Sequence, residues 1–231
     1  MSTHPELLAT VDVVSFVFRD SKLNVILWLR DREPFNNHLA LPGAIINGMS
    51  ADSDMQDTVD RVFSSRLGVK PSYIEQVCTI GNNTRDHRGW SISTVYMALV
   101  PDTSDAISDM VEACQVIPVE DIEDGSVDLP FDHKELIMKA KERLASKALY
   151  SSMPLLLLNS HGFTVNELID VYNSIMTTPV KPITLRKRIE FLESKGAVTE
   201  IGKTSSGKGR PKNIYSHDNH VNYFDRSILA S

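Results

Sequence analysis

The chain has 231 residues, 42% of them hydrophobic, and a net charge of −6. This length predicts one large domain or two small ones, with enough apolar side chains to bury a core. Two cysteines are too few for a disulfide framework, no apolar run approaches the roughly 20 residues of a membrane span, and the N-terminus lacks a secretory signal pattern. We therefore expect a cytoplasmic protein.

The first 150 residues alternate between strand-like and helix-like segments. We expect strands at residues 10–18, 23–28, 74–80 and 91–100 and a weaker segment at 108–119. Apolar residues spaced three and four apart predict a helix over residues 55–67, ended by Gly68, and a second helix follows residue 130 with Asp132 as its cap. This order predicts an α+β domain over residues 1–150, a sheet packed with helices on both sides.

Residues 151–218 have a different pattern. Thr164 and Glu167 form a capping box at the start of one helix, Pro179 ends it, and Thr184 begins a second helix that stops at Gly196. Two short strands, 197–201 and 213–215, flank a loop rich in Gly and Lys. Helix, turn, helix and basic hairpin form the order of a winged helix-turn-helix, with residues 219–231 as a C-terminal tail.

The basic residues are concentrated in this second domain. Between Lys181 and Lys212 there are nine basic and three acidic residues, a net charge of +6, which leaves −12 on the rest of the chain. Such asymmetry indicates a segment that faces nucleic acid. The candidate DNA-binding residues are Lys181, Thr184, Arg186, Lys187, Arg188, Lys203, Lys208, Arg210 and Lys212. A solvated basic helix with a mobile loop is the alternative.

The stretch from Gly43 to Val69 resembles the Nudix box, the metal-binding element of pyrophosphate-cleaving Nudix hydrolases. Arg61 lies at the arginine of the box and Gly68-Val69 at its end, with about four extra residues in the loop. Val62, Ser65 and Arg66 stand where the box has glutamates. Because such a site holds Mg²⁺ or Mn²⁺ through several carboxylate oxygens, we expect no metal ion and no catalytic residue here.

The segment Thr84–Val100 resembles the Arg-Asp-Pro-Arg-Gly segment of the Nudix branch that handles ADP-ribose, with His87 at the proline position. Arginine side chains in such a loop can bind phosphate with two parallel hydrogen bonds, and Trp90 can stack on a base or a ribose. The candidate effector-binding residues are Arg30, Arg32, Phe35, Gly43, Arg85, Asp86, Arg88 and Trp90. A surface turn with an Asp–Arg pair and a core tryptophan is the alternative.

Taken together, the order of these motifs resembles the NrtR family, Nudix-related transcriptional regulators of NAD metabolism. The resemblance covers about residues 11–215, including Leu41-Pro42-Gly43 and Gly209-Arg210-Pro211. It implies a homodimeric repressor of NAD biosynthesis or salvage genes that binds pseudo-palindromic operator DNA, uses no cofactor and is released by ADP-ribose. Two other functions remain open at this point: an ADP-ribose pyrophosphatase that uses displaced carboxylates, and a protein–protein adaptor that binds no DNA.

Overall fold

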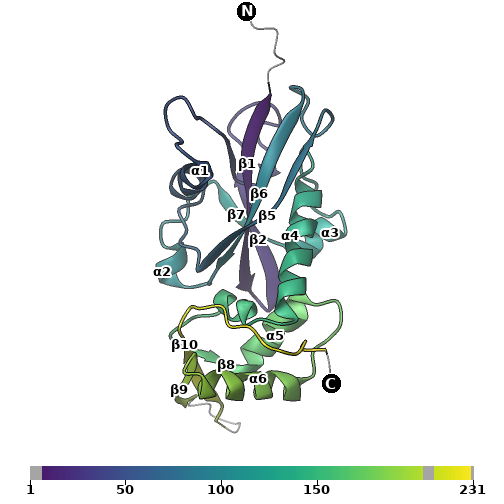
Figure 1. The fold of residues 1–231 in the computed structure, drawn as a ribbon. Helices are drawn as coiled ribbons and strands as arrows, with labels where there is room; N and C mark the ends of the chain where they lie inside the picture. Colours follow the sequence, from purple (N-terminus) through teal and green to yellow (C-terminus); the bar gives the residue numbers. More distant parts are fainter. Residues whose placement is uncertain (1–6, 205–210, 230–231) are drawn as a thin grey trace, which may run out of the picture.

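The computed structural model describes residues 7–204 and 211–229 and contains a mixed sheet built around one long strand (Figure 1). β1 pairs in parallel with β6 along most of its length. On its other edge β1 pairs antiparallel with β4 over its first half and with β2 over its second half. The strands of this sheet are β1 (Leu8–Arg19), β2 (Lys22–Leu29), β3 (Leu39–Ala40), β4 (Gly43–Ile45), β5 (Tyr73–Asn82), β6 (Ser91–Val100) and β7 (Cys114–Pro118).

Side chains on β1 alternate between the two faces of the sheet. Val11, Val13 and Val17 pack with the first helix, α1, whereas Val14 and Phe16 pack with the long helix α4. Successive side chains of a strand point to opposite faces, so an unbroken run of apolar residues requires helices on both faces. Figure 1 shows α1 and α4 on opposite sides of the sheet, which confirms the predicted α/β/α sandwich.

The helices of this domain differ from the sequence prediction in two places. The predicted helix 55–67 is α-helical only over its first eight residues and ends in a π-helical turn, after which Gly68 has a φ of 64°. Asp132 occupies the predicted N-cap position of α4, but its side chain makes no capping hydrogen bond. The helical segments are α1 (Met55–Val62), the π turn (Phe63–Leu67), α2 (Ser104–Ile107), α3 (Val119–Glu123) and α4 (His133–Ala148).

The second half has the predicted winged-helix order, with a three-stranded sheet ordered β8-β10-β9. Thr164 and Glu167 form the predicted capping box. The second helix begins two residues before the predicted Thr184, with Pro182 in its first turn, where the missing proline N–H has no cost. The elements are a 3₁₀ helix (Met153–Leu157), β8 (Phe163–Thr164), α5 (Val165–Ile175), α6 (Pro182–Ser194), β9 (Val198–Lys203) and β10 (Asn213–His217).

A continuous apolar core crosses the predicted boundary at residue 150. One cluster of buried side chains runs from Phe16 in the sheet through Leu156 in the 3₁₀ helix to Leu185 on α6. The tail passes back over this junction, where the N–H of Ile228 donates to the carbonyl oxygen of Leu149 at 2.7 Å. Within the described residues, no helix is both long and apolar enough to cross a lipid bilayer. The division at residue 150 stays a prediction.

Candidate functional site

A cavity of about 550 Å³ opens at the end of the sheet near β4 and the loop after β5. Six of the eight predicted effector-binding residues line it: Arg30, Arg32, Gly43, Arg85, Asp86 and Arg88. Arg61 and Arg66 add two further guanidinium groups, whereas Asp12, Asp31, Glu33 and Asp86 are the acidic residues of the wall. The cavity therefore has an excess of positive charge, and segments far apart in the sequence contribute to it.

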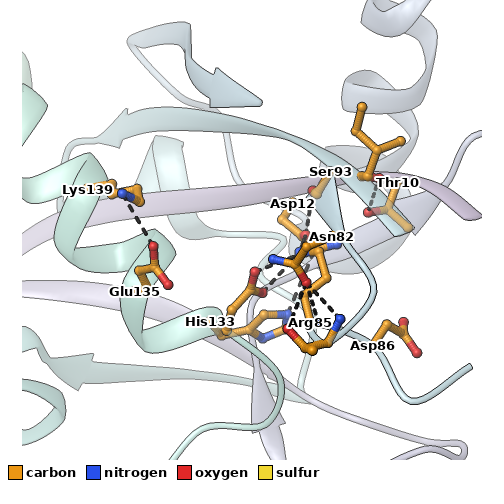
Figure 2. Close-up of polar contacts among 12 residues, drawn as sticks. Thr10, Asp12, Asn82, Arg85, Asp86, Ser93, His133, Glu135 and Lys139 are labelled. Atoms are coloured by element: carbon orange, nitrogen blue, oxygen red, sulfur yellow. Dashed lines mark hydrogen bonds and ion pairs between the residues drawn. The ribbon is translucent and has the colours of Figure 1, made fainter. Parts of the chain in front are cut away.

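Arg85 is held inside the protein by carboxylates on two elements (Figure 2). Its Nε and Nη2 donate to Asp132 at 2.9 and 3.0 Å, and Nη2 lies 3.4 Å from Oδ2 of Asp12 on β1. Burial lowers the pKa of Arg85, but these carboxylates raise it above its usual value overall. Because its side chain is only 5% exposed and already paired, Arg85 organises the inner wall of the cavity rather than forming a free arm for a ligand.

Two more of the arginines have carboxylate partners. The Nε and Nη2 of Arg88 bond to Asp86, and the nearest of these contacts is 2.7 Å. Burial raises the pKa of Asp86, but the hydrogen bonds from Arg88 bring it below its usual value. Arg61 makes a two-point pair with Asp52, 2.6 Å at its shorter contact, and this pair holds the pKa of Asp52 far below its usual range. These two ion pairs exist before any ligand binds, so Arg88 and Arg61 have little positive charge left to attract a ligand.

Arg30 and Arg66 are the least neutralised cations of the cavity. The only hydrogen bond from the Arg30 side chain that involves a described residue goes to the carbonyl oxygen of Pro34, and its guanidinium lies 5.2 Å from the centroid of the Phe131 ring. Burial, followed by repulsion from Arg88 and Arg66, lowers the pKa of Arg30. Arg66 stacks 4.7 Å from the Trp28 ring centroid, and the one carboxylate within 4 Å of it among the described residues is that of the exposed Asp31, at 3.8 Å. Like charges held together in this way favour an anionic ligand.

Two predicted effector residues do not line the cavity. Phe35 packs against Phe131 with ring centroids 4.8 Å apart, so it supports a wall residue without being one. Trp90 is 48% exposed and covers Gly81, where an added Cβ would lie 2.9 Å from the indole ring. Contact between either of them and a ligand stays a prediction.

The three residues predicted to replace the glutamates of the Nudix box lie in different environments. Val62 is fully buried among apolar side chains between α1 and the sheet. Ser65 and Arg66 line the cavity, and the Ser65 hydroxyl donates to the carbonyl oxygen of Arg61 at 2.6 Å. Within the described part of the chain, no group of three or more His, Cys, Asp or Glu side chains is arranged to hold a metal ion.

Six of the nine predicted DNA-binding residues lie at the surface of α6 and the wing. Lys181, Arg186 and Lys187 are exposed, Thr184 is half-buried, and Lys203 and Lys212 lie exposed on or beside the strands of the wing. Arg186 and Lys212 line one groove together with Thr164. Lys208 and Arg210 lie outside the described residues. Figure 1 places α6, β9 and β10 together at the end of the molecule away from α1. DNA contact by these residues stays a prediction.

Arg188 requires a correction, because the sequence prediction placed it on the DNA-facing surface. The structure leaves it 8% exposed, with Nη2 donating to the carbonyl oxygens of Leu149 at 2.7 Å and Arg226 at 3.1 Å. The guanidinium also lies 4.0 Å from the centroid of the Phe224 ring. On a helix, positions 186 and 187 point away from position 188, so neighbouring basic residues can have opposite environments.

Sequence reasoning missed several residues of the cavity wall as candidates for ligand binding, among them Asp12, Trp28, Arg61, Phe131 and His133. Asp12 carried a detectable signal, because it is a carboxylate inside the apolar run Thr10–Phe18. A charged residue in a buried strand requires a partner or a function. Phe131 and His133 had no comparable signal, since only the fold brings the start of α4 to β1.

None of the protein-family profiles searched matches this chain. A relative from Acinetobacter baylyi, described as ADPR responsive transcriptional repressor NtrR, is 30% identical over 215 residues, which are 93% of this chain and 83% of the relative. The crystal structure of Shewanella oneidensis NrtR complexed with a 27mer DNA has a TM-score of 0.82 and 34% identity, covering 95% of this chain and 98% of that one.

A further structure is that of the Nudix domain of Shewanella oneidensis NrtR complexed with ADP ribose. It is 38% identical, with a TM-score of 0.53, and covers 61% of this chain and 90% of that one. The likeness to the NrtR relatives thus extends over both halves of the chain, the arginine-lined cavity and the winged helix. The chain belongs to the NrtR family of Nudix-related transcriptional regulators.

Proposed function

We propose that this chain is a transcriptional repressor that binds operator DNA through α6 and the wing, and that ADP-ribose bound in the arginine cavity releases the DNA. The relatives' descriptions and the ligands of their crystal structures support both halves of this proposal. The family resemblance further implies that the regulated genes belong to NAD biosynthesis or salvage. A cytoplasmic location, with access to DNA, is part of the same proposal.

The observation that carries the effector half is the poorly neutralised Arg30. It lies on a cavity wall with Arg66 and Arg88 nearby, and its pKa is lowered first by burial and then by repulsion from these two arginines. A diphosphate brings two negative charges and several acceptor oxygens, so its binding relieves this repulsion and gives charge-assisted hydrogen bonds. Trp28 and Phe131 supply aromatic surface on the same wall for a nucleoside.

The residues of the same cavity wall favour ligand binding by a receptor over hydrolysis of the ligand. Divalent metal ions in Nudix hydrolases require several anionic oxygens. Here Val62 is buried among apolar residues, Ser65 is neutral and Arg66 is cationic, so the residues present do not fit such an ion. Asp52, a nearby carboxylate, is already engaged by Arg61. A receptor that leaves its ligand intact can report the ligand's concentration.

Binding of DNA is supported by the exposed cations on α6. Residues near the start of a recognition helix reach base edges and phosphates in the major groove, and Arg186 and Lys187 occupy that part of α6. We propose a two-fold dimer, which would contact half-sites separated by about 10 base pairs or a multiple of that spacing. ADP-ribose releases the DNA only if it binds the arrangement that cannot bind DNA several kcal/mol more tightly than the arrangement that can.

A fluorescence anisotropy titration tests the proposal. The DNA probe is a labelled duplex obtained by repeated selection of binders from a random pool. Adding ADP-ribose to the complex should lower the anisotropy, and chromatography should then recover ADP-ribose without AMP in the presence of Mg²⁺. Persistent binding at saturating ADP-ribose would contradict the effector role, and stoichiometric turnover to AMP would favour the hydrolase.

Two arginine variants sharpen this experiment. Arg30→Gln removes a cation that has no described carboxylate partner, whereas Arg32→Gln removes one that is largely exposed and bonds to Asp31 at 3.2 Å. Release of DNA from the Arg30→Gln variant should require at least about tenfold more ADP-ribose than release from the wild type. The Arg32→Gln variant should show a much smaller increase. DNA affinity without ADP-ribose should be unchanged in both. Equal effects of the two substitutions would argue against Arg30 as the principal phosphate contact.

A further inference from the structure

Two largely buried polar residues, His133 and Asp12, face each other across the inner end of the cavity without bonding. The Nε2 of His133, at the start of α4, lies 3.9 Å from Oδ1 of Asp12 on β1. This separation is too long for a hydrogen bond. Both residues line the cavity, although Asp12 is only 8% exposed and His133 only 4% exposed. Figure 2 shows the two side chains beside Arg85.

The other contacts of His133 assign its ring as a donor at Nε2. Its Nδ1 accepts a hydrogen bond from the backbone N–H of Leu41 at 2.9 Å. Burial lowers the pKa of His133, which outweighs the opposing effect of Asp12, so the ring is neutral near pH 7. A neutral imidazole that accepts at Nδ1 carries its proton at Nε2. The cavity therefore contains an N–H donor that forms no hydrogen bond to any described residue.

Asp12 supplies the complementary acceptor. Its Oδ2 receives hydrogen bonds from the Ser93 hydroxyl at 2.6 Å and from Arg85 at 3.4 Å, whereas Oδ1 accepts none from the part of the chain that the structure describes. Gly43 lies directly against this oxygen, and a Cβ at that position would be 2.4 Å from Oδ1. Glycine at position 43 therefore leaves room beside an acceptor that any larger residue would crowd.

We propose that Asp12 and His133 together bind a hydroxyl group of the effector's terminal sugar. A hydroxyl oxygen about 2.8 Å from each atom fits the 3.9 Å gap, where the hydroxyl accepts a hydrogen bond from the Nε2–H of His133 and donates one to Oδ1 of Asp12. This assignment rests on the proposed function. The arginines bind the diphosphate, and the hydroxyl pair selects what is attached beyond it.

Asp12 and His133 determine which chemical group beyond the diphosphate the cavity accepts. A carboxylate beside a neutral donor suits an uncharged polyol, whereas a phosphate at the same place is repelled by Asp12. ADP fills the arginine part of the cavity and leaves both atoms unpaired. ATP brings a further phosphate towards Asp12. ADP-ribose is therefore expected to bind more tightly than either, because it alone supplies a hydroxyl there.

Isothermal titration calorimetry of the full chain with ADP-ribose, ADP and ATP tests the assignment. The wild-type chain should prefer ADP-ribose over ADP by about tenfold, the effect of one well-paired buried group. In His133→Asn, the amide oxygen can still accept from Leu41, but the Nε2 donor is lost. This variant should bind ADP-ribose about tenfold more weakly and ADP with unchanged affinity. His161→Asn, an exposed histidine in the second domain, is the matched control and should change neither.

A second variant guards against a folding defect in the first. Asp12→Asn keeps the shape of the side chain and removes its charge, so it should weaken ADP-ribose binding and improve ATP binding relative to wild type. Thermal unfolding verifies that each variant is folded. Equal wild-type affinities for ADP and ADP-ribose, or a parallel loss of both in His133→Asn, would overturn the hydroxyl site while leaving the effector cavity intact. Failure of the wild-type chain to bind any of the three nucleotides would remove the proposed function as well.

Discussion

The Nη2 atom of Arg188, on the proposed recognition helix α6, donates to the carbonyl oxygen of Leu149, directly after α4, at 2.7 Å. The start of α4 carries His133 and is preceded by Asp132, which holds Arg85 at the cavity. Its 16 residues span about 24 Å at 1.5 Å per residue. One helix therefore contacts the effector cavity at one end and α6 at the other, and it offers a physical connection between the two sites.

Arg188→Ala should lower the free energy of unfolding by about 2–4 kcal/mol, because it leaves buried carbonyl oxygens of Leu149 and Arg226 without their donor and removes the contact with Phe224. Urea denaturation followed by circular dichroism measures this change. Arg186→Ala is the matched control, since that side chain is exposed on the same helix and should change stability by less than about 0.5 kcal/mol. Equal stability of both variants would contradict the structural role of Arg188.

Operator binding should depend steeply on salt, because each protein cation that contacts a DNA phosphate releases a condensed counterion. Arg186→Ala should weaken binding and, if Arg186 contacts a phosphate, reduce the slope of log K against log salt by about 1. Anisotropy titrations at salt concentrations from about 50 to about 200 mM provide the measurement. A wild-type affinity that is insensitive to salt would instead support the protein–protein adaptor.

The stability of the folded protein should fall in acid because Glu75, on β5, becomes protonated. Burial raises its pKa, but hydrogen bonds from Lys147, Tyr73 and Arg143 lower it below the usual value overall. A carboxyl group with a lowered folded-state pKa stabilises the protein above its unfolded pKa of about 4.3, and this contribution is lost as the pH falls through the folded pKa. Glu75→Gln should therefore reduce the melting temperature at pH 7 and flatten its dependence on pH below about 4.5. A steeper acid dependence in this variant would contradict the assignment.

Local sequence patterns were sufficient to predict most of the secondary structure. The β1–β2 hairpin was predicted from two apolar runs around a polar turn, and Asp20 and Ser21 do adopt positive φ angles of 54° and 58° there, as hairpin turns require. The capping box of α5 involves Thr164 and Glu167, three residues apart, so one helical turn brings them together. Such features depend on spacing within a few residues, which a sequence shows directly.

Asp132 marks where this kind of reasoning failed. Its position before α4 is typical of a helix cap, yet its carboxylate bonds to Arg85, 47 residues away in sequence. A buried guanidinium needs a charged partner more than a solvated helix end needs a cap, so the ion pair prevailed. Arg188 was misplaced for a related reason, because its partners at Leu149 and Arg226 lie about 40 residues away on either side.

The sequence by itself determined that this chain forms a Nudix-like sandwich followed by a winged helix and that basic residues concentrate in the second half. The absence of carboxylates from metal-binding positions stays a prediction from the sequence. Only the tertiary structure decided which arginines are neutralised, which ones face the cavity, and that Asp12 and His133 leave a gap of 3.9 Å between them. The physical reason is that local periodicity selects helices and strands, whereas the charge state and orientation of a buried polar group depend on partners that folding brings from distant parts of the chain.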